Sequence, residues 1–124
     1  MTSKMSRQVP EARAGMLQAI LGSTSAERVL IFLYCRNEGY ARQISRFFGV
    51  ALRPVQRQLE KLESAGVLFS RELGRTRLYE FNPRYPFLAE LKALLGRALE
   101  FYPEPDRKAL TMNRRHPRKA GKPW

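Results

Sequence analysis

The segment from Ala41 to Leu59 constrains the fold more than any other part of the chain. With Ala41 counted as position one, a small residue falls at position five (Ser45) and a glycine at position nine (Gly49). Hydrophobic residues fall at positions four, eight, ten and fifteen, namely Ile44, Phe48, Val50 and Val55. A small residue lets two helices cross closely, and a glycine accommodates the left-handed turn between them. The spacing therefore predicts two short helices joined by a tight turn.

The spacing of apolar residues predicts further helices on both sides of this pair. The expected helices cover Glu11–Leu21, Thr24–Arg36, Tyr40–Phe48, Leu52–Ser64 and Pro86–Phe101. Thr24 and Glu27 have the spacing of a capping box, which favours a helix over a buried strand for the apolar run that follows. The stretch Asn37-Glu38-Gly39 is expected to be a turn.

Two short runs, Val67–Leu73 and Arg75–Phe81, meet at Gly74 and predict a β-hairpin. The two-residue period of a strand is expected to place one set of side chains on the face that packs on the helices. This set is Val67, Phe69, Tyr79 and Phe81. The expected fold class is thus mainly α with a small β-hairpin.

The net charge of +12 favours a polyanionic partner. Seven basic and two acidic residues lie in 104–124, which leaves a net charge of +7 for the residues before them. Residues 1–10 are polar and are expected to be flexible. Residues 11–102 are expected to form the domain, and 103–124 a disordered basic tail, because this segment is rich in proline and cations.

Several other function classes find no support in the sequence. No apolar run approaches the roughly 20 residues of a membrane helix, and 1–22 does not resemble a secretory signal. Cys35 lies in an apolar run and is expected to be a buried thiol, while His116 has no metal-ligating neighbours. Surface positions are expected for Glu60, Glu63, Glu72 and Glu80. We expect a cytoplasmic protein that is not an enzyme and has no cofactor or metal.

Together these segments resemble the winged helix-turn-helix domains of ArsR-like bacterial transcription regulators. The resemblance covers about 22–102 and is especially close over Val55–Val67 and Arg75–Asn82. It is nearest to winged helices that in other proteins precede a small nucleotidyltransferase domain, which is not expected in this chain. One departure is Ala51, where family members often carry the Ser or Thr that caps the recognition helix; Pro54 in the first turn partly offsets this loss.

The resemblance implies that 52–64 is a recognition helix and that the hairpin is the wing. With Val55, Leu59 and Leu62 facing inward, the polar residues between them face outward. Arginine can bind guanine, and glutamine adenine, through two hydrogen bonds in the major groove. Base contacts are expected from Arg53, Gln56 and Arg57. Backbone contacts are expected from Tyr40, Arg42, Arg46, Lys61, Arg71, Arg75 and Arg77.

Apolar stripes on the first and last helices predict a homodimer, as formed by the terminal helices of ArsR-like proteins. The expected interface residues are Met16, Leu17, Ile20, Leu88, Leu91 and Leu95. The predicted function is a sequence-specific regulator of transcription that binds double-stranded DNA in the nucleoid, with an effector that the sequence does not identify. Three alternatives stay open: a nucleoid-associated or RNA-binding protein, a protein-interaction module, and an antitoxin-like partner of a separate nucleotidyltransferase.

Overall fold

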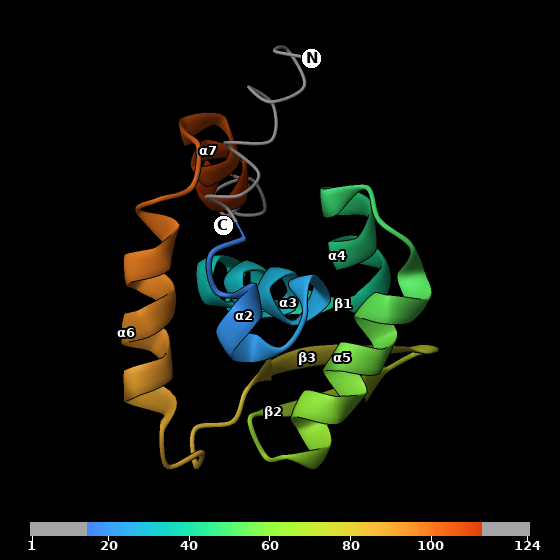
Figure 1. Cartoon of the computed structure of the whole chain (residues 1–124). Coiled ribbons are helices and arrows are strands. Elements are labelled where there is room, and N and C mark those ends of the chain that lie inside the picture. Colours follow the sequence, from blue (N-terminus) through green and yellow to red (C-terminus); the bar gives the residue numbers. More distant parts are fainter. Residues whose placement is uncertain (1–14, 113–124) are drawn as a thin grey trace, which may run out of the picture.

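The computed structural model describes residues 15–112, which form a mainly helical fold with one small antiparallel sheet (Figure 1). The helices are α2 (Gln18–Leu21), α3 (Thr24–Arg36), α4 (Ala41–Phe48), α5 (Leu52–Ser64), α6 (Leu88–Leu99) and α7 (Glu104–Met112). The strands are β1 (Glu38–Tyr40), β2 (Leu68–Leu73) and β3 (Thr76–Phe81), in the sheet order β1-β3-β2. The predicted start of the first helix at Glu11 and the flexible segment 1–10 lie outside the described residues.

Helix α3 occupies the middle of the molecule, with α6 on one side and α5 on the other (Figure 1). Its apolar run is buried, and Cys35 is buried with it, as predicted. The capping prediction was wrong by one residue. The Ser23 Oγ accepts the Ala26 N–H at 2.9 Å, because Ser23 has the extended backbone of an N-cap and Thr24 is already helical. Glu27 does not cap the helix and lies buried instead.

The predicted turn at 37–39 was only partly right. Asn37 has a left-handed backbone (φ 73°) and ends α3, but Glu38–Tyr40 then forms strand β1. This strand pairs antiparallel with β3, with Gly39 opposite Tyr79. A Cβ atom on Gly39 would lie 2.8 Å from the Phe32 ring, so only glycine fits between the strand and α3.

Helices α4 and α5 form the closely crossed pair that the spacing predicted. Gly49 ends α4 in a left-handed conformation (φ 66°). The Ser45 Oγ donates a hydrogen bond to the Val50 carbonyl at 2.6 Å, which ties α4 to the turn. Ile44 from α4 and Val55 from α5 are fully buried beside it. These contacts fix the direction in which α5 leaves the turn.

The hairpin forms as predicted, but its register corrects the assignment of one face. Leu68 pairs with Phe81, and Phe69 pairs with Glu80. Directly paired residues share a face, so Phe69 lies on the face opposite to that of Phe81. Because two residues connect Leu73 to Thr76, each odd-numbered residue of β2 pairs with an even-numbered residue of β3. Two odd-numbered residues, one from each strand, therefore lie on opposite faces of the sheet.

The prediction that 103–124 is disordered was wrong for 104–112, which form α7. Leu110 is fully buried, and the Arg36 guanidinium donates to the carbonyls of Ala109 (3.2 Å) and Leu110 (2.8 Å) at the end of this helix. Pro105 falls in the first turn of α7, where a missing N–H costs nothing. The remaining part of the predicted tail, 113–124, lies outside the described residues. Within 15–112 no helix is both long and apolar enough to cross a membrane.

Candidate nucleic-acid interface

The outward side of α5 carries a row of three cations. Val55 and Leu59 are fully buried and fix the inner side of the helix. Arg57 is two residues from each, about 200° around the helix from Val55, and is exposed. Arg53 and Lys61 are four residues before and after it and are also exposed. The three side chains therefore lie in one row along the helix.

Among the described residues this row lies beside one acid, the exposed Glu60, but forms no ion pair with it. None of its three cations takes part in an ion pair there. Gln56 is half-buried at the side of the row and differs in this respect from the exposed arginines. Such a row can offer its hydrogen-bond donors to a phosphate or a base edge.

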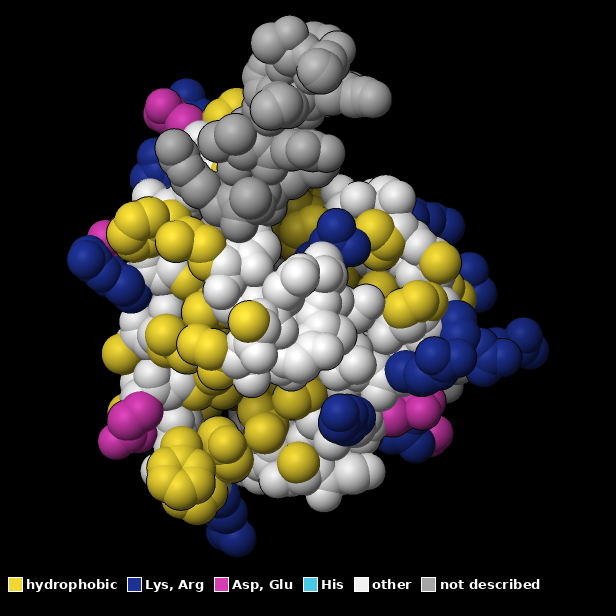
Figure 2. All heavy atoms as spheres, viewed as in Figure 1, with side chains coloured by type: hydrophobic (Ala, Val, Ile, Leu, Met, Phe, Trp, Pro, Cys, Tyr) yellow, Lys and Arg dark blue, Asp and Glu magenta, His cyan; other side chains and the backbone are white. Residues whose placement is uncertain are grey.

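Helix α4 extends the basic surface. Arg42 and Arg46 are one helical turn apart, exposed, and without an ion pair inside 15–112. Figure 2 shows Lys and Arg side chains gathered along the right-hand edge, where Figure 1 places α4, α5 and the tip of the hairpin. Tyr40 is not on this helix, contrary to expectation. It ends β1, and its N–H donates to the Gln43 Oε1 at 3.1 Å.

The three arginines of the hairpin differ in their ion pairs, although all three were expected to contact the DNA backbone. Arg71 pairs with Glu38 (3.7 Å) and Glu80 (3.3 Å). Arg77 lies on the opposite face, pairs with Glu72 (3.4 Å), and donates to the Ser70 Oγ (3.0 Å). Arg75, in the turn, has no ion pair among the described residues. It is the hairpin arginine most available to an external anion.

The predicted dimer residues fall into two groups. Leu17 and Leu95 are buried in the core of one chain, so their assignment to a dimer surface was wrong. Leu88 and Leu91 are partly buried against the same core. Met16 and Ile20 remain exposed, at 53% and 72%. Phe87, Leu94 and Phe101 are also exposed, although they were not among the expected interface residues.

The burial of the Glu27 carboxylate was also not predicted from the sequence. Glu27 Oε1 accepts the Leu17 N–H at 3.1 Å, and Oε2 accepts the Tyr102 hydroxyl at 2.7 Å. Burial raises the pKa of Glu27, and burial together with the Glu27 contact raises the pKa of Tyr102. The network links α2, α3 and the segment after α6. Its only signal in the sequence is a lone acid beside an apolar helical run.

No protein-family model, curated protein or solved structure matches the chain. Within 15–112 no group of three or more His, Cys, Asp or Glu residues could hold a metal ion. The main chemical feature of the described residues is a basic surface that spans α4, α5 and the hairpin tip.

Proposed function

We propose that this chain is a sequence-specific transcription regulator that binds double-stranded DNA, and that its fold is a winged helix-turn-helix of the ArsR-like kind. One observation carries the proposal: the row of Arg53, Arg57 and Lys61 on the outward side of α5, which forms no ion pair within 15–112. Exposed like charges on one helix disfavour the fold slightly, and an anionic partner would offset this repulsion. The crossing of α4 and α5 holds that row away from the core.

In the proposed complex α5 enters the major groove. Arg53, Gln56 and Arg57 contact base edges, and Lys61 contacts a phosphate. Arg42 and Arg46 on α4, with Tyr40 before it, contact the flanking backbone, as does Arg75 at the hairpin tip. Arg71 and Arg77 contribute only after exchanging their carboxylate partners for phosphate. Since both pairs are half-exposed, each costs little to break.

We further propose a homodimer located in the cytoplasm, with no catalytic activity. The exposed apolar side chains on and beside α2 and α6, which include Met16, Ile20, Phe87 and Leu94, support a self-association surface. Figure 2 shows these helices carrying apolar side chains on the visible face. Sedimentation equilibrium is expected to give a dimer for the wild type and a monomer for Ile20→Lys; a wild-type monomer at high concentration contradicts the dimer.

The test of DNA recognition is the selection of bound duplexes from a random library. We expect one enriched motif. On that motif Arg57→Ala is expected to weaken binding by about 1–3 kcal/mol and to relax the preference at one base position. Arg75→Ala is expected to weaken binding about equally on all duplexes, because phosphate contacts carry no base information.

Arg97→Ala is the matched control, because Arg97 is exposed on α6 and pairs with Glu100, away from α5. It is expected to leave DNA affinity unchanged. Binding without an enriched motif would favour a nucleoid-associated or RNA-binding protein instead. Absence of binding to any nucleic acid would favour a protein-interaction module, including an antitoxin-like one.

A further inference from the structure

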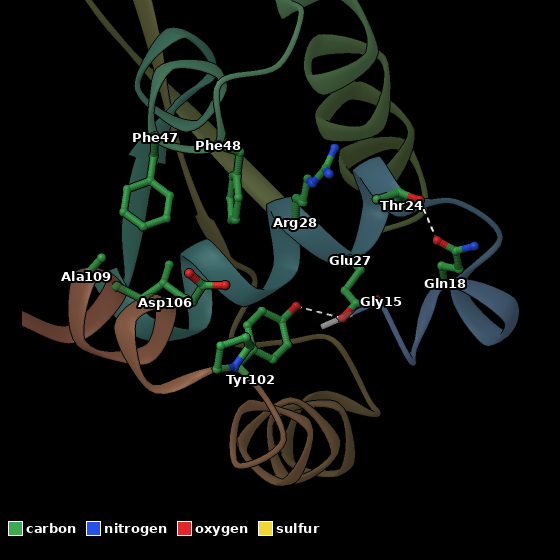
Figure 3. Close-up of a pocket in the computed structure, with 12 residues that line it drawn as sticks. Gly15, Gln18, Thr24, Glu27, Arg28, Phe47, Phe48, Tyr102, Asp106 and Ala109 are labelled. Atoms are coloured by element: carbon green, nitrogen blue, oxygen red, sulfur yellow. Dashed lines mark hydrogen bonds between the residues drawn. The ribbon is translucent and has the colours of Figure 1, made fainter. Parts of the chain in front are cut away.

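A cavity of about 590 Å³ is lined by residues of α3, α4 and α7, together with Gly15, Gln18, Tyr102 and Pro103 (Figure 3). Its volume falls in the range of about 300–1,000 Å³ that is typical of small-molecule sites. Half of its twelve lining residues are apolar or aromatic: Phe47, Phe48, Tyr102, Pro103, Ala109 and Leu110. The cavity exists because α7 folds back on the body of the protein.

The aromatic wall is held in place by contacts among the lining residues and with Phe32 and Arg36 outside the lining. Phe47 and Phe48 form an edge-to-face pair with centroids 4.9 Å apart. Phe47 also packs on Phe32 at 5.7 Å, and the Arg36 guanidinium lies 5.2 Å from its centroid. On the other side, the Tyr102 ring is fixed by its hydrogen bond to Glu27. A wall fixed in advance loses little entropy when a planar ligand binds.

One cation of the cavity lining, Arg28, is available to an anion. The Arg28 guanidinium lies 5.8 Å from the Phe48 centroid, and Arg28 forms no ion pair with any described residue. Glu27 also lines the cavity; burial raises its pKa, whereas its hydrogen bonds with Tyr102 and Leu17 and the charge of Arg28 lower it. Asp106 also faces the cavity, from α7, and is exposed.

We propose that this cavity binds a small aromatic anion, of the aryl carboxylate or sulfonate class, with its ring between Phe47, Phe48 and Tyr102 and its charged group at Arg28. The wall residues Phe47 and Phe48 end α4, directly before the Gly49 turn into α5. A bound ring would therefore brace the α4–α5 pair against α3 and α7. This regulatory consequence rests on the proposed DNA-binding function, whereas ligand binding itself does not.

Two dyes that differ in charge test the proposal on the full chain. The probes are 1-anilinonaphthalene-8-sulfonate and N-phenyl-1-naphthylamine, which share a ring system but only the first of which is anionic. Arg28→Gln is expected to lower affinity for the anionic dye by about tenfold, the loss of one charge-assisted hydrogen bond, and to leave the neutral dye nearly unaffected. Equal losses for both dyes would overturn the assignment of Arg28.

Three further variants locate the dye. Ala109→Trp fills the cavity from α7 and is expected to abolish binding of both dyes. Lys108→Trp adds the same side chain on α7 outside the cavity lining, and Ile20→Lys removes an exposed apolar side chain elsewhere; both are expected to keep the binding of the neutral dye. Circular dichroism checks that each variant is folded. Binding that survives Ala109→Trp, or that Ile20→Lys removes, would overturn the cavity site.

DNA affinity measured with and without the anionic dye separates the two proposals. A change of affinity on the selected motif that Ala109→Trp abolishes supports the regulatory role. An unchanged affinity overturns that role and leaves the ligand site standing. If the protein binds the dye but no DNA, the proposed function fails and the site remains.

Discussion

Helices α3 and α5 are both 13 residues long, yet their environments are opposite. Helix α3 buries residues on almost every side, eight in all, including one carboxylate. Helix α5 buries only Val55 and Leu59. Helix α3 is thus packed on nearly all sides, whereas α5 is packed only on the side that carries Val55 and Leu59. Stability and surface chemistry are therefore expected to respond to different substitutions, and the contrast can be tested at each helix in turn.

The largest loss of stability is expected when Phe32 in α3 is substituted. Its ring is fully buried, contacts Phe47, and lies against Gly39 and the Arg36 guanidinium. Phe32→Ala leaves a cavity among these groups and is expected to lower the free energy of unfolding by about 3–5 kcal/mol. Urea denaturation followed by circular dichroism measures the loss. Glu60→Ala on the exposed side of α5 is the comparison, with an expected change within about 0.5 kcal/mol.

The next effect concerns the buried carboxylate of α3. Tyr102→Phe removes one of the two donors to Glu27 and is expected to cost about 1–3 kcal/mol of unfolding free energy. Tyr85→Phe is the matched control, because the Tyr85 hydroxyl makes no hydrogen bond within 15–112. Equal effects of the two substitutions would mean that the Glu27–Tyr102 bond contributes nothing.

The same carboxylate predicts a pH dependence with a definite sign. Burial raises the pKa of Glu27 in the folded protein, so the folded state keeps its proton where the unfolded state has released it. The stabilisation is present below the ordinary value of 4.5 and is lost as the pH rises through the raised folded value. Relative to Glu27→Gln, the wild type is expected to lose stability as the pH rises through this range. A pH-independent difference between the two unfolding free energies would contradict this.

Much of the fold could be predicted because the elements involved are long and periodic. The crossed pair α4–α5 and helix α3 were predicted from the spacing of their apolar residues. Strand β1 was missed because three residues are too few to show a period. Helix α7 was missed because prolines and cations dominate the composition of 103–124, whereas one buried leucine, Leu110, docks the helix.

The candidate site was predictable only in part, since a sequence does not contain the partners of a side chain. The outward position of Arg57 followed from its distance to Val55 along the helix. The ion pairs of Arg71 and Arg77 depend on the strand register and could not be foreseen. An apolar stripe also looks the same whether it packs on its own core, as Leu95 does, or faces outward.

A smaller effect is expected where α6 packs on the less buried side of α3. A Cβ atom on Gly96 would lie 2.6 Å from the Tyr34 hydroxyl and 3.2 Å from the ring carbon that bears it. Alanine is the better helix former by about 1 kcal/mol, so the two terms oppose each other. Gly96→Ala is expected to be destabilising or neutral in the wild type and stabilising in a Tyr34→Phe background. A double-mutant cycle measures the coupling, and additive effects would show that the hydroxyl does not limit this contact.

The smallest expected effect has the opposite sign and concerns α5. Arg57 stands one turn from both Arg53 and Lys61, which repel its charge, and three residues before Glu60, with which it forms no ion pair. Arg57→Ala removes both repulsions and introduces a residue of higher helix propensity, and it is expected to raise the free energy of unfolding by about 0.2–0.7 kcal/mol at low salt. Salt screens the repulsion, so the gain is expected to shrink as the ionic strength rises. Arg97→Ala is the matched control, because it removes an arginine that lies 2.9 Å from its Glu100 partner and is expected to gain less. A loss of stability in Arg57→Ala would show that the side chain makes a stabilising contact within the fold. The cations on α5 would then stabilise the fold, as the residues of α3 do. They would no longer support the proposal of an external anionic partner.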